Sequence, residues 1–102
     1  MKKYKIDLSE LAVSDIDDFI EYIIFVYKAP ITAKRHYDGL FKTIKSLSLI
    51  AENLPITNKT NFQQFGYNVR RINHKKMTII YTVHFDIVYI HRVIAQSLIT
   101  DL

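Results

Sequence analysis

The 102-residue sequence contains no cysteine and no tryptophan, and it has only two glycines and two prolines. The absence of cysteine excludes disulfide bonds, thiolate metal ligands and a cysteine nucleophile. Because glycine and proline are scarce, tight turns should be few and most of the chain should be regular secondary structure. No apolar run approaches the roughly 20 residues that a membrane span requires, since the stretch from Phe19 to Tyr27 is short and interrupted by Glu21.

The composition is that of one folded domain covering residues 1–102. Hydrophobic residues make up 49% of the chain and charged residues 24%, which is typical of a globular protein rather than a disordered one. The N-terminal segment MKKYKIDLSE turns acidic before any apolar stretch develops, so it does not fit a signal peptide. We therefore expect a cytoplasmic protein without a membrane segment. The formal net charge of +4 permits an anionic partner.

Apolar periodicity predicts a strand and two helices in the N-terminal half. The strand is expected at Tyr4–Leu8. The first helix follows, capped by Ser9 or by Ser14, and the second runs from Pro30 to about Asn53. Because the link between the helices is short, we expect them to pack as an antiparallel hairpin.

The C-terminal half predicts a loop followed by an antiparallel meander. The segment Pro55–Gly66 is polar and unpatterned, and its length makes it a candidate binding loop. Three strands are expected after it, at Tyr67–Asn73, Met77–His84 and Ile87–Ile94. The result is an α+β fold of order β-α-α-β-β-β, with the helical hairpin on one face of a small, mainly antiparallel sheet. The second face should remain at least partly open.

Positive charge gathers on the predicted meander. From Arg70 to Arg92 the chain carries five Lys or Arg residues and a single acid, Asp86. Eight of the ten acidic residues of the chain come before this segment. Four of them, Asp15, Asp17, Asp18 and Glu21, cluster in the early turns of the first predicted helix, where they suit the positive end of the helix dipole. This distribution predicts that the sheet binds something negatively charged.

Strand alternation predicts which of these residues share a face. Asn68 and Arg70 should lie opposite Val69, and Thr78 and His84 should share the open face with Arg70. Arg71 should then point toward the helices unless its strand is bulged. Tyr89 and Phe65 are aromatic residues that could stack on a base.

The segments DIDDFIEYI, NVRRI, MTIIYTV and IVYIHRV, taken with the element order, resemble the RelE/ParE superfamily of bacterial type II toxins. The resemblance covers essentially the whole chain. It implies a toxin that is neutralised by a cognate antitoxin protein and that needs no cofactor or metal. RelE-like members cleave mRNA on the ribosome, whereas ParE-like members inhibit DNA gyrase, so the resemblance implies one of these two targets.

A RelE-like reaction needs a base, an acid and cations that stabilise the phosphorane. On this reading the resemblance implies catalytic roles for Arg70, His84 and Arg92, with His74 and His91 as further candidates for proton transfer. The wider RNA- or anion-binding set consists of Asn68, Arg70, Arg71, Lys75, Lys76 and Thr78.

Two segments depart from the RelE-like pattern. Met77-Thr78 stands where many members read Tyr-Arg, and Ala95–Leu98 stands where they usually carry His, Arg or Tyr. Three hypotheses therefore remain open. The chain is a toxin acting on mRNA or gyrase, a catalytically degenerate member that still binds its antitoxin, or a stand-alone nucleic-acid-binding domain.

Overall fold

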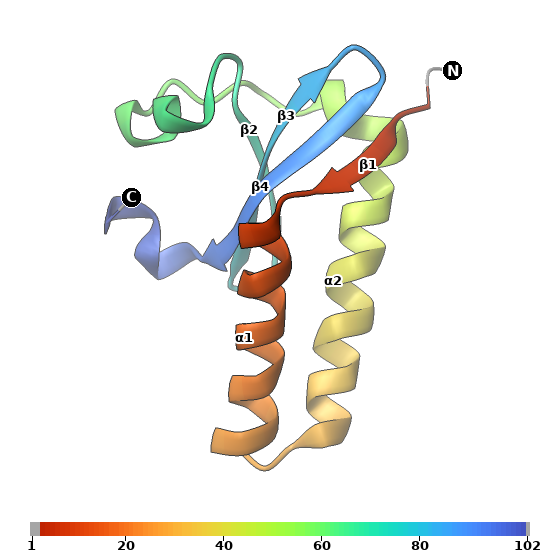
Figure 1. The fold of residues 1–102 in the computed structure, drawn as a ribbon, viewed down its shortest axis with the longest axis vertical. Coiled ribbons are helices and arrows are strands. Elements are labelled where there is room, and N and C mark those ends of the chain that lie inside the picture. The colour runs from red at the N-terminus through yellow and green to blue at the C-terminus, as the bar shows by residue number, and fades with distance from the viewer. Residues whose placement is uncertain (1–2, 102) are drawn as a thin grey trace.

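The computed structural model describes residues 3–101, and its element order is the predicted one. The helices and strands are β1 (Lys5–Leu8), α1 (Glu10–Val26), α2 (Pro30–Ile50), β2 (Arg70–His74), β3 (Met77–His84) and β4 (Ile87–Ala95). Three short 3-10 helices complete the chain, η1 (Ala51–Asn53), η2 (Thr60–Phe65) and η3 (Gln96–Asp101). The α+β class and the helical hairpin are confirmed (Figure 1).

The four strands form one sheet in the order β1-β4-β3-β2. β1 runs parallel to β4, and the other two pairs are antiparallel. α1 and α2 lie side by side on one face of the sheet, and the hairpin extends well beyond it (Figure 1). This extension leaves the end of the hairpin without a covering strand.

Local signals in the sequence set where the helices begin. Ser9 is the N-cap of α1, and its Oγ accepts a hydrogen bond from the Ala12 amide at 3.0 Å. The same hydroxyl donates to the His91 carbonyl at 2.7 Å, so the cap also ties α1 to β4. Of the two predicted caps, Ser9 is therefore correct. Pro30 opens α2 as predicted.

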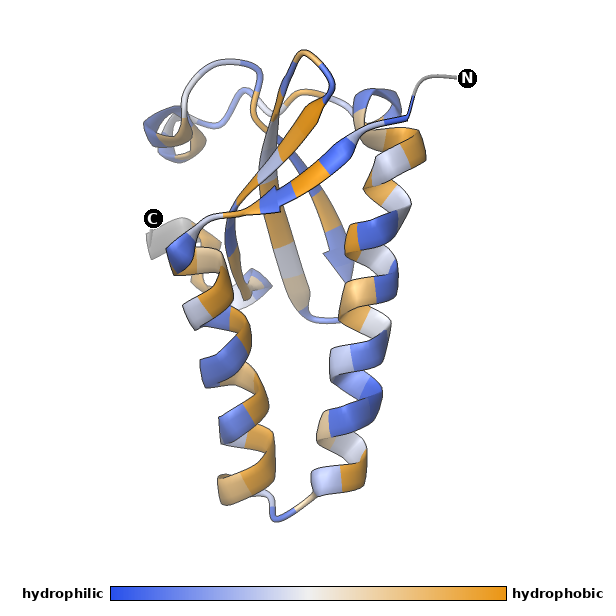
Figure 2. Ribbon diagram, turned by 45° about the vertical axis from the view of Figure 1, so that its right-hand side comes forward, coloured by the Kyte–Doolittle hydropathy of each residue, from blue (hydrophilic) through white to orange (hydrophobic). Residues whose placement is uncertain are grey.

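The main core lies between the hairpin and the sheet. The apolar faces of α1 and α2 turn inward, and hydrophobic residues continue along α1 to its end (Figure 2). Tyr81 is fully buried there, and its hydroxyl donates to the Ala51 carbonyl at 2.7 Å. Burial raises the pKa of Tyr81 to about 12, so this hydroxyl stays protonated and structural.

The second face of the sheet is more covered than predicted. The segment expected as an unpatterned loop forms η2, and η3 follows β4; together they pack a second apolar cluster onto this face. Its members are Phe62, Val69, Ile80, Ile94 and Ile99. As a result Thr78 and Thr82, which also point to this side, are buried. The part of this face toward the β3–β4 turn stays open, and His84 is exposed there.

The strand limits differ from prediction mainly at β2. This strand begins at Arg70 instead of Tyr67, because Asn68 adopts a left-handed conformation with φ of 55° that interrupts the extended chain. His74 belongs to β2 and not to the turn that follows. β3 has the predicted limits, and β4 extends one residue further, to Ala95. Within residues 3–101, no helix is both long and apolar enough to cross a membrane.

Candidate functional site

The structure places Arg70 on the helical side of the sheet. Its Nε donates to the Leu54 carbonyl at 2.9 Å, and it pairs across the strands with Tyr81, whose side chain lies in the main core. The prediction that Arg70 shares the second face with Thr78 and His84 is therefore wrong. The physical reason is Val69, whose side chain fills the second apolar cluster and turns its neighbour Arg70 the other way.

The same alternation puts Arg71 on the second face, where it was not expected. Its guanidinium carbon lies 5.7 Å from the centroid of the Phe62 ring, an arrangement typical of a cation–π contact. Asn68 lies exposed before β2 begins, outside the strand. Of the predicted anion-binding residues, Asn68 therefore follows the loop that contains η2, and Arg71 contacts that loop through Phe62.

The remaining predicted binding residues are dispersed. Thr78 is fully buried, and its hydroxyl donates to Asn73 Oδ1 at 2.8 Å, so it is not available to a large ligand. Lys75 and Lys76 form the β2–β3 turn and border a cavity beside the helical hairpin. The structure does not bring the predicted set together at one place.

Arg92 is held by a carboxylate from the first helix. Its Nε and Nη2 donate to the two oxygens of Asp15 at 2.8 and 2.9 Å, and Asp15 Oδ2 also accepts from the Val93 amide at 3.0 Å. A β-bulge makes this geometry possible, because the pairing of β3 with β4 shifts between Ile80 and Tyr81. The hydrogen bond that Arg92 donates to Asp15 raises the pKa of Arg92. A guanidinium paired in this way is not free to clamp a phosphate.

The open part of the second face holds a pair of histidines joined through a hydroxyl. Thr82 Oγ1 lies 2.8 Å from the Nε2 of His84 and 2.8 Å from the Nε2 of His91. Since the hydroxyl carries one proton, it donates to one imidazole and accepts from the other. The His91 ring contacts Phe65 of η2 and Tyr89 of its own strand, with centroids 5.4 and 4.8 Å apart.

Burial controls the charge of His91. It lowers the pKa of His91, and the neighbouring His84 lowers it further. His91 is therefore neutral near physiological pH, and the three groups form a short chain along which a proton could move. Thr82 and His84 are two residues apart on one strand, so alternation places them on the same face. The bulge that turns His91 toward them leaves no local sequence signal.

His74 has a structural role. Its Nδ1 lies 3.1 Å from Thr43 Oγ1, and that hydroxyl donates to the Gly39 carbonyl, so Nδ1 must carry the proton. Its buried Nε2 has no hydrogen-bond partner within the described residues and faces Gly39, where a Cβ would lie only 2.9 Å away. Burial lowers the pKa of His74, and the nearby Lys75 and His36 lower it further. The imidazole is therefore a neutral packing group.

The arrangement around Thr82 supplies proton-transfer groups without the matching cations. Arg70 lies on the opposite face, Arg92 is bound to Asp15, and Arg71 stacks on Phe62. The described part of the chain also contains no group of three or more metal-binding side chains. The three predicted catalytic residues, Arg70, His84 and Arg92, therefore do not form one catalytic site in this geometry.

Comparison with known proteins gives a family match over most of the chain. Residues 6–98 match the family described as the ParE toxin of the type II toxin–antitoxin system, parDE. Among solved structures, a chain from the chromosomal ParDE toxin–antitoxin system of P. aeruginosa superposes with a TM-score of 0.73 at 14% identity, covering 93% of this chain and 98% of that one. No curated protein matches.

The Asp15–Arg92 pair should contribute measurably to folding. In a double-mutant cycle with Asp15→Asn and Arg92→Gln, we expect a coupling free energy of about 1–3 kcal/mol, because the pair is bidentate and charge-assisted. Its side chains are only 14% and 29% exposed, which limits screening by water. Urea unfolding of the four proteins measures this coupling.

The exposed Lys34–Asp38 pair serves as the matched control for that cycle. Its side chains are 77% and 60% exposed, so its coupling should stay below about 0.5 kcal/mol. If the Asp15–Arg92 coupling were no larger than this value, Arg92 would be free for a role in binding or catalysis.

The lowered pKa of His91 predicts a dependence of stability on pH. In the unfolded chain His91 takes up a proton near its ordinary pKa of about 6.5, whereas in the folded chain it does so only at lower pH. The free energy of unfolding should therefore fall as the pH drops below about 6.5. His91→Gln should reduce this slope and leave the part due to His74. Urea unfolding at several pH values measures it, and an unchanged slope in His91→Gln would contradict the assignment.

Proposed function

Because the chain belongs to the ParE toxin family of type II toxin–antitoxin systems, we propose that it arrests growth by inhibiting DNA gyrase and does not cleave mRNA. The protein is a toxin with a cognate antitoxin. The finer question is its target, and the dispersal of the candidate catalytic residues supports a target other than ribosome-bound mRNA. Phosphodiester cleavage needs proton transfer and charge stabilisation at one phosphate.

The strongest single observation is where the side chains of Arg70, Arg71 and Arg92 lie. A RelE-like reaction would place cations beside the Thr82, His84 and His91 chain, on the open part of the second face. Arg70 instead donates to Leu54 on the helical side, and Arg92 is paired with Asp15. A proton-transfer chain without a nearby phosphate clamp is a poor nuclease.

A direct comparison of two assays tests this proposal. Purified toxin should inhibit gyrase-catalysed supercoiling of a relaxed plasmid and should leave ribosome-bound mRNA intact in primer-extension assays. His84→Ala should keep its inhibition of gyrase within about twofold, because loss of one general acid or base matters only for a chemical step, where it typically costs at least 100-fold. The growth arrest caused by induced expression should likewise persist in His84→Ala.

Two outcomes would contradict the proposal. Cleavage of mRNA that falls by more than tenfold in His84→Ala would identify a RelE-like nuclease. Harmless expression of folded protein, without inhibition of either target, would identify a degenerate member that only binds its antitoxin.

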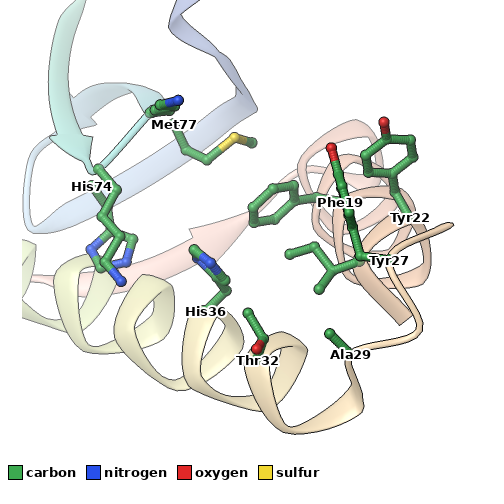
Figure 3. Close-up of a pocket in the computed structure, with 11 residues that line it drawn as sticks. Phe19, Tyr22, Tyr27, Ala29, Thr32, His36, His74 and Met77 are labelled. Atoms are coloured by element: carbon green, nitrogen blue, oxygen red, sulfur yellow. The ribbon is translucent and has the colours of Figure 1, made fainter. Parts of the chain in front are cut away.

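The antitoxin is best matched by a cavity of about 440 Å³ between α1, α2 and the β2–β3 turn (Figure 3). Its wall is mostly apolar, with Phe19 and His36 in edge-to-face contact at 5.7 Å. Lys75 and Lys76 border it. We propose that an apolar anchor of the antitoxin enters this cavity and that carboxylates next to the anchor meet the two lysines, since such charge complementarity fixes orientation and speeds association.

Replacing a half-exposed tyrosine tests this assignment with little effect on folding. Tyr22 lines the cavity and is 51% exposed, so Tyr22→Ala should weaken binding of the purified antitoxin about tenfold or more, the usual cost of losing an aromatic anchor. Tyr37 is 43% exposed on α2 and does not line this cavity, so Tyr37→Ala is the matched control. Isothermal titration gives both affinities. Equal losses in the two variants would remove the cavity as the antitoxin site.

A further inference from the structure

A second hollow is lined by residues of the segment between α2 and β2. Figure 1 shows this segment at the end of the molecule away from the α1–α2 loop. The volume of the hollow is about 650 Å³, and it is lined by residues from both sides of η2. None of its lining residues belongs to the antitoxin cavity or to the Thr82 hydrogen-bond chain. The roles described above therefore leave it unassigned.

The floor of this hollow is apolar and firmly held. Phe62 is 1% exposed and Val69 is 3% exposed, and both belong to the apolar cluster packed on Ile80 of β3. The guanidinium carbon of Arg71 lies over the Phe62 ring, 5.7 Å from its centroid. Because the side chains of Phe62 and Val69 are almost completely buried, they fix the shape of the floor, and a planar ligand in the hollow would have a cation close by.

Its polar lining consists largely of carboxamides and carries no charged side chain. The four amide residues are Asn58, Gln63, Gln64 and Asn68. Gln64 donates to the Asn61 carbonyl at 2.7 Å, which leaves its own carbonyl oxygen available. Within the described residues, the side chains of the other three show no hydrogen bond to the protein. Carboxamides present donors and acceptors in one plane, which matches the edge of a nucleobase.

Tyr67 supplies an aromatic surface at the same place. It lines the hollow between Gly66 and Asn68 and is 95% exposed, so its ring packs against almost nothing in the protein. Gly66 and Asn68 both have positive φ, at 114° and 55°, and this backbone path projects Tyr67 outward. Exposed tyrosines of this kind act as stacking surfaces for unpaired bases.

The charges around the hollow fit a phosphate backbone. From Pro55 to Asn73 the sequence has three cations and no acid. Arg70 is turned to the helical side of the sheet, which leaves Lys59, next to the lining residue Asn58, and Arg71, above the Phe62 ring. We propose that this hollow binds an unpaired base of a single-stranded nucleic acid, which stacks on Tyr67 while carboxamides read its edge. Lys59 and Arg71 would contact the flanking phosphates. This role is independent of gyrase inhibition and of antitoxin binding.

A peptide strand is a poorer match for the same place. Strand addition needs a free sheet edge, and β2 is the edge strand here. At this end of β2, however, Ile56 already forms a bridge with Arg70, and the Thr57 amide donates to the Val69 carbonyl at 2.8 Å. The chain itself thus occupies the hydrogen-bonding groups that an added strand would use.

Fluorescence anisotropy with labelled octanucleotides tests the proposal on the purified, antitoxin-free toxin. The probes are oligo(dA), oligo(rA) and an abasic octamer with the same backbone. The first two should bind at low salt, and the abasic octamer should bind at least tenfold more weakly, because it has no base to stack on Tyr67. The relative affinity of oligo(dA) and oligo(rA) distinguishes DNA from RNA as the source of the base.

Substitution of Tyr67 separates base recognition from simple charge attraction. Tyr67→Ala should weaken oligo(dA) or oligo(rA) binding about tenfold, and Phe85→Ala, which removes another ring that is 92% exposed in a turn, should not. Equal binding of abasic and adenine octamers, or equal effects of the two variants, would overturn the proposal and leave a nonspecific basic surface. Absence of binding to every octamer at millimolar concentration, including the case in which an extended peptide binds instead, would also overturn it.

Discussion

The rest of the structure depends on the burial of β3 from both sides. All six residues from Met77 to Thr82 are buried, although a strand in a sheet with helices on one face normally alternates between core and solvent. The hairpin covers one face, so η2 and η3 must cover the other. Phe62, Ile94 and Ile99 thereby occupy the surface on which a sheet-binding ligand would otherwise lie.

A second constraint follows from the extra residue in β4. The bulge lets consecutive residues of β4 leave the regular alternation, so His91 reaches Thr82 while Arg92 reaches Asp15 on α1. Past the end of β1, the edge of β4 has no neighbouring strand. The backbone amide of Val93 finds its hydrogen-bond acceptor there in Asp15 Oδ2. One local irregularity therefore decides that Arg92 acts as a link between helix and sheet.

Sequence periodicity predicted what depends on repeating patterns. The element order, the limits of β3 and the helix cap at Ser9 follow from alternation and capping chemistry. The face of Arg70 was predicted wrongly, because the side chain of Val69 fills the second apolar cluster and turns Arg70 toward Tyr81 on the helical side. The sequence also did not predict that Phe62 covers the second face of the sheet or that Arg92 pairs with Asp15. Both depend on contacts between distant segments, and no local pattern encodes them.

The same burial of β3 explains why both proposed binding places lie toward the ends of the molecule. With the middle of the sheet filled on both faces, surface that can accept a partner remains where helices or loops extend past it. One such place is the apolar cavity at the hairpin, and another is the carboxamide-lined hollow beside η2. Because these two places share no residue, an antitoxin anchored at the hairpin would leave the Tyr67 hollow chemically intact. Base binding at the hollow would then be independent of an antitoxin that contacts the hairpin alone.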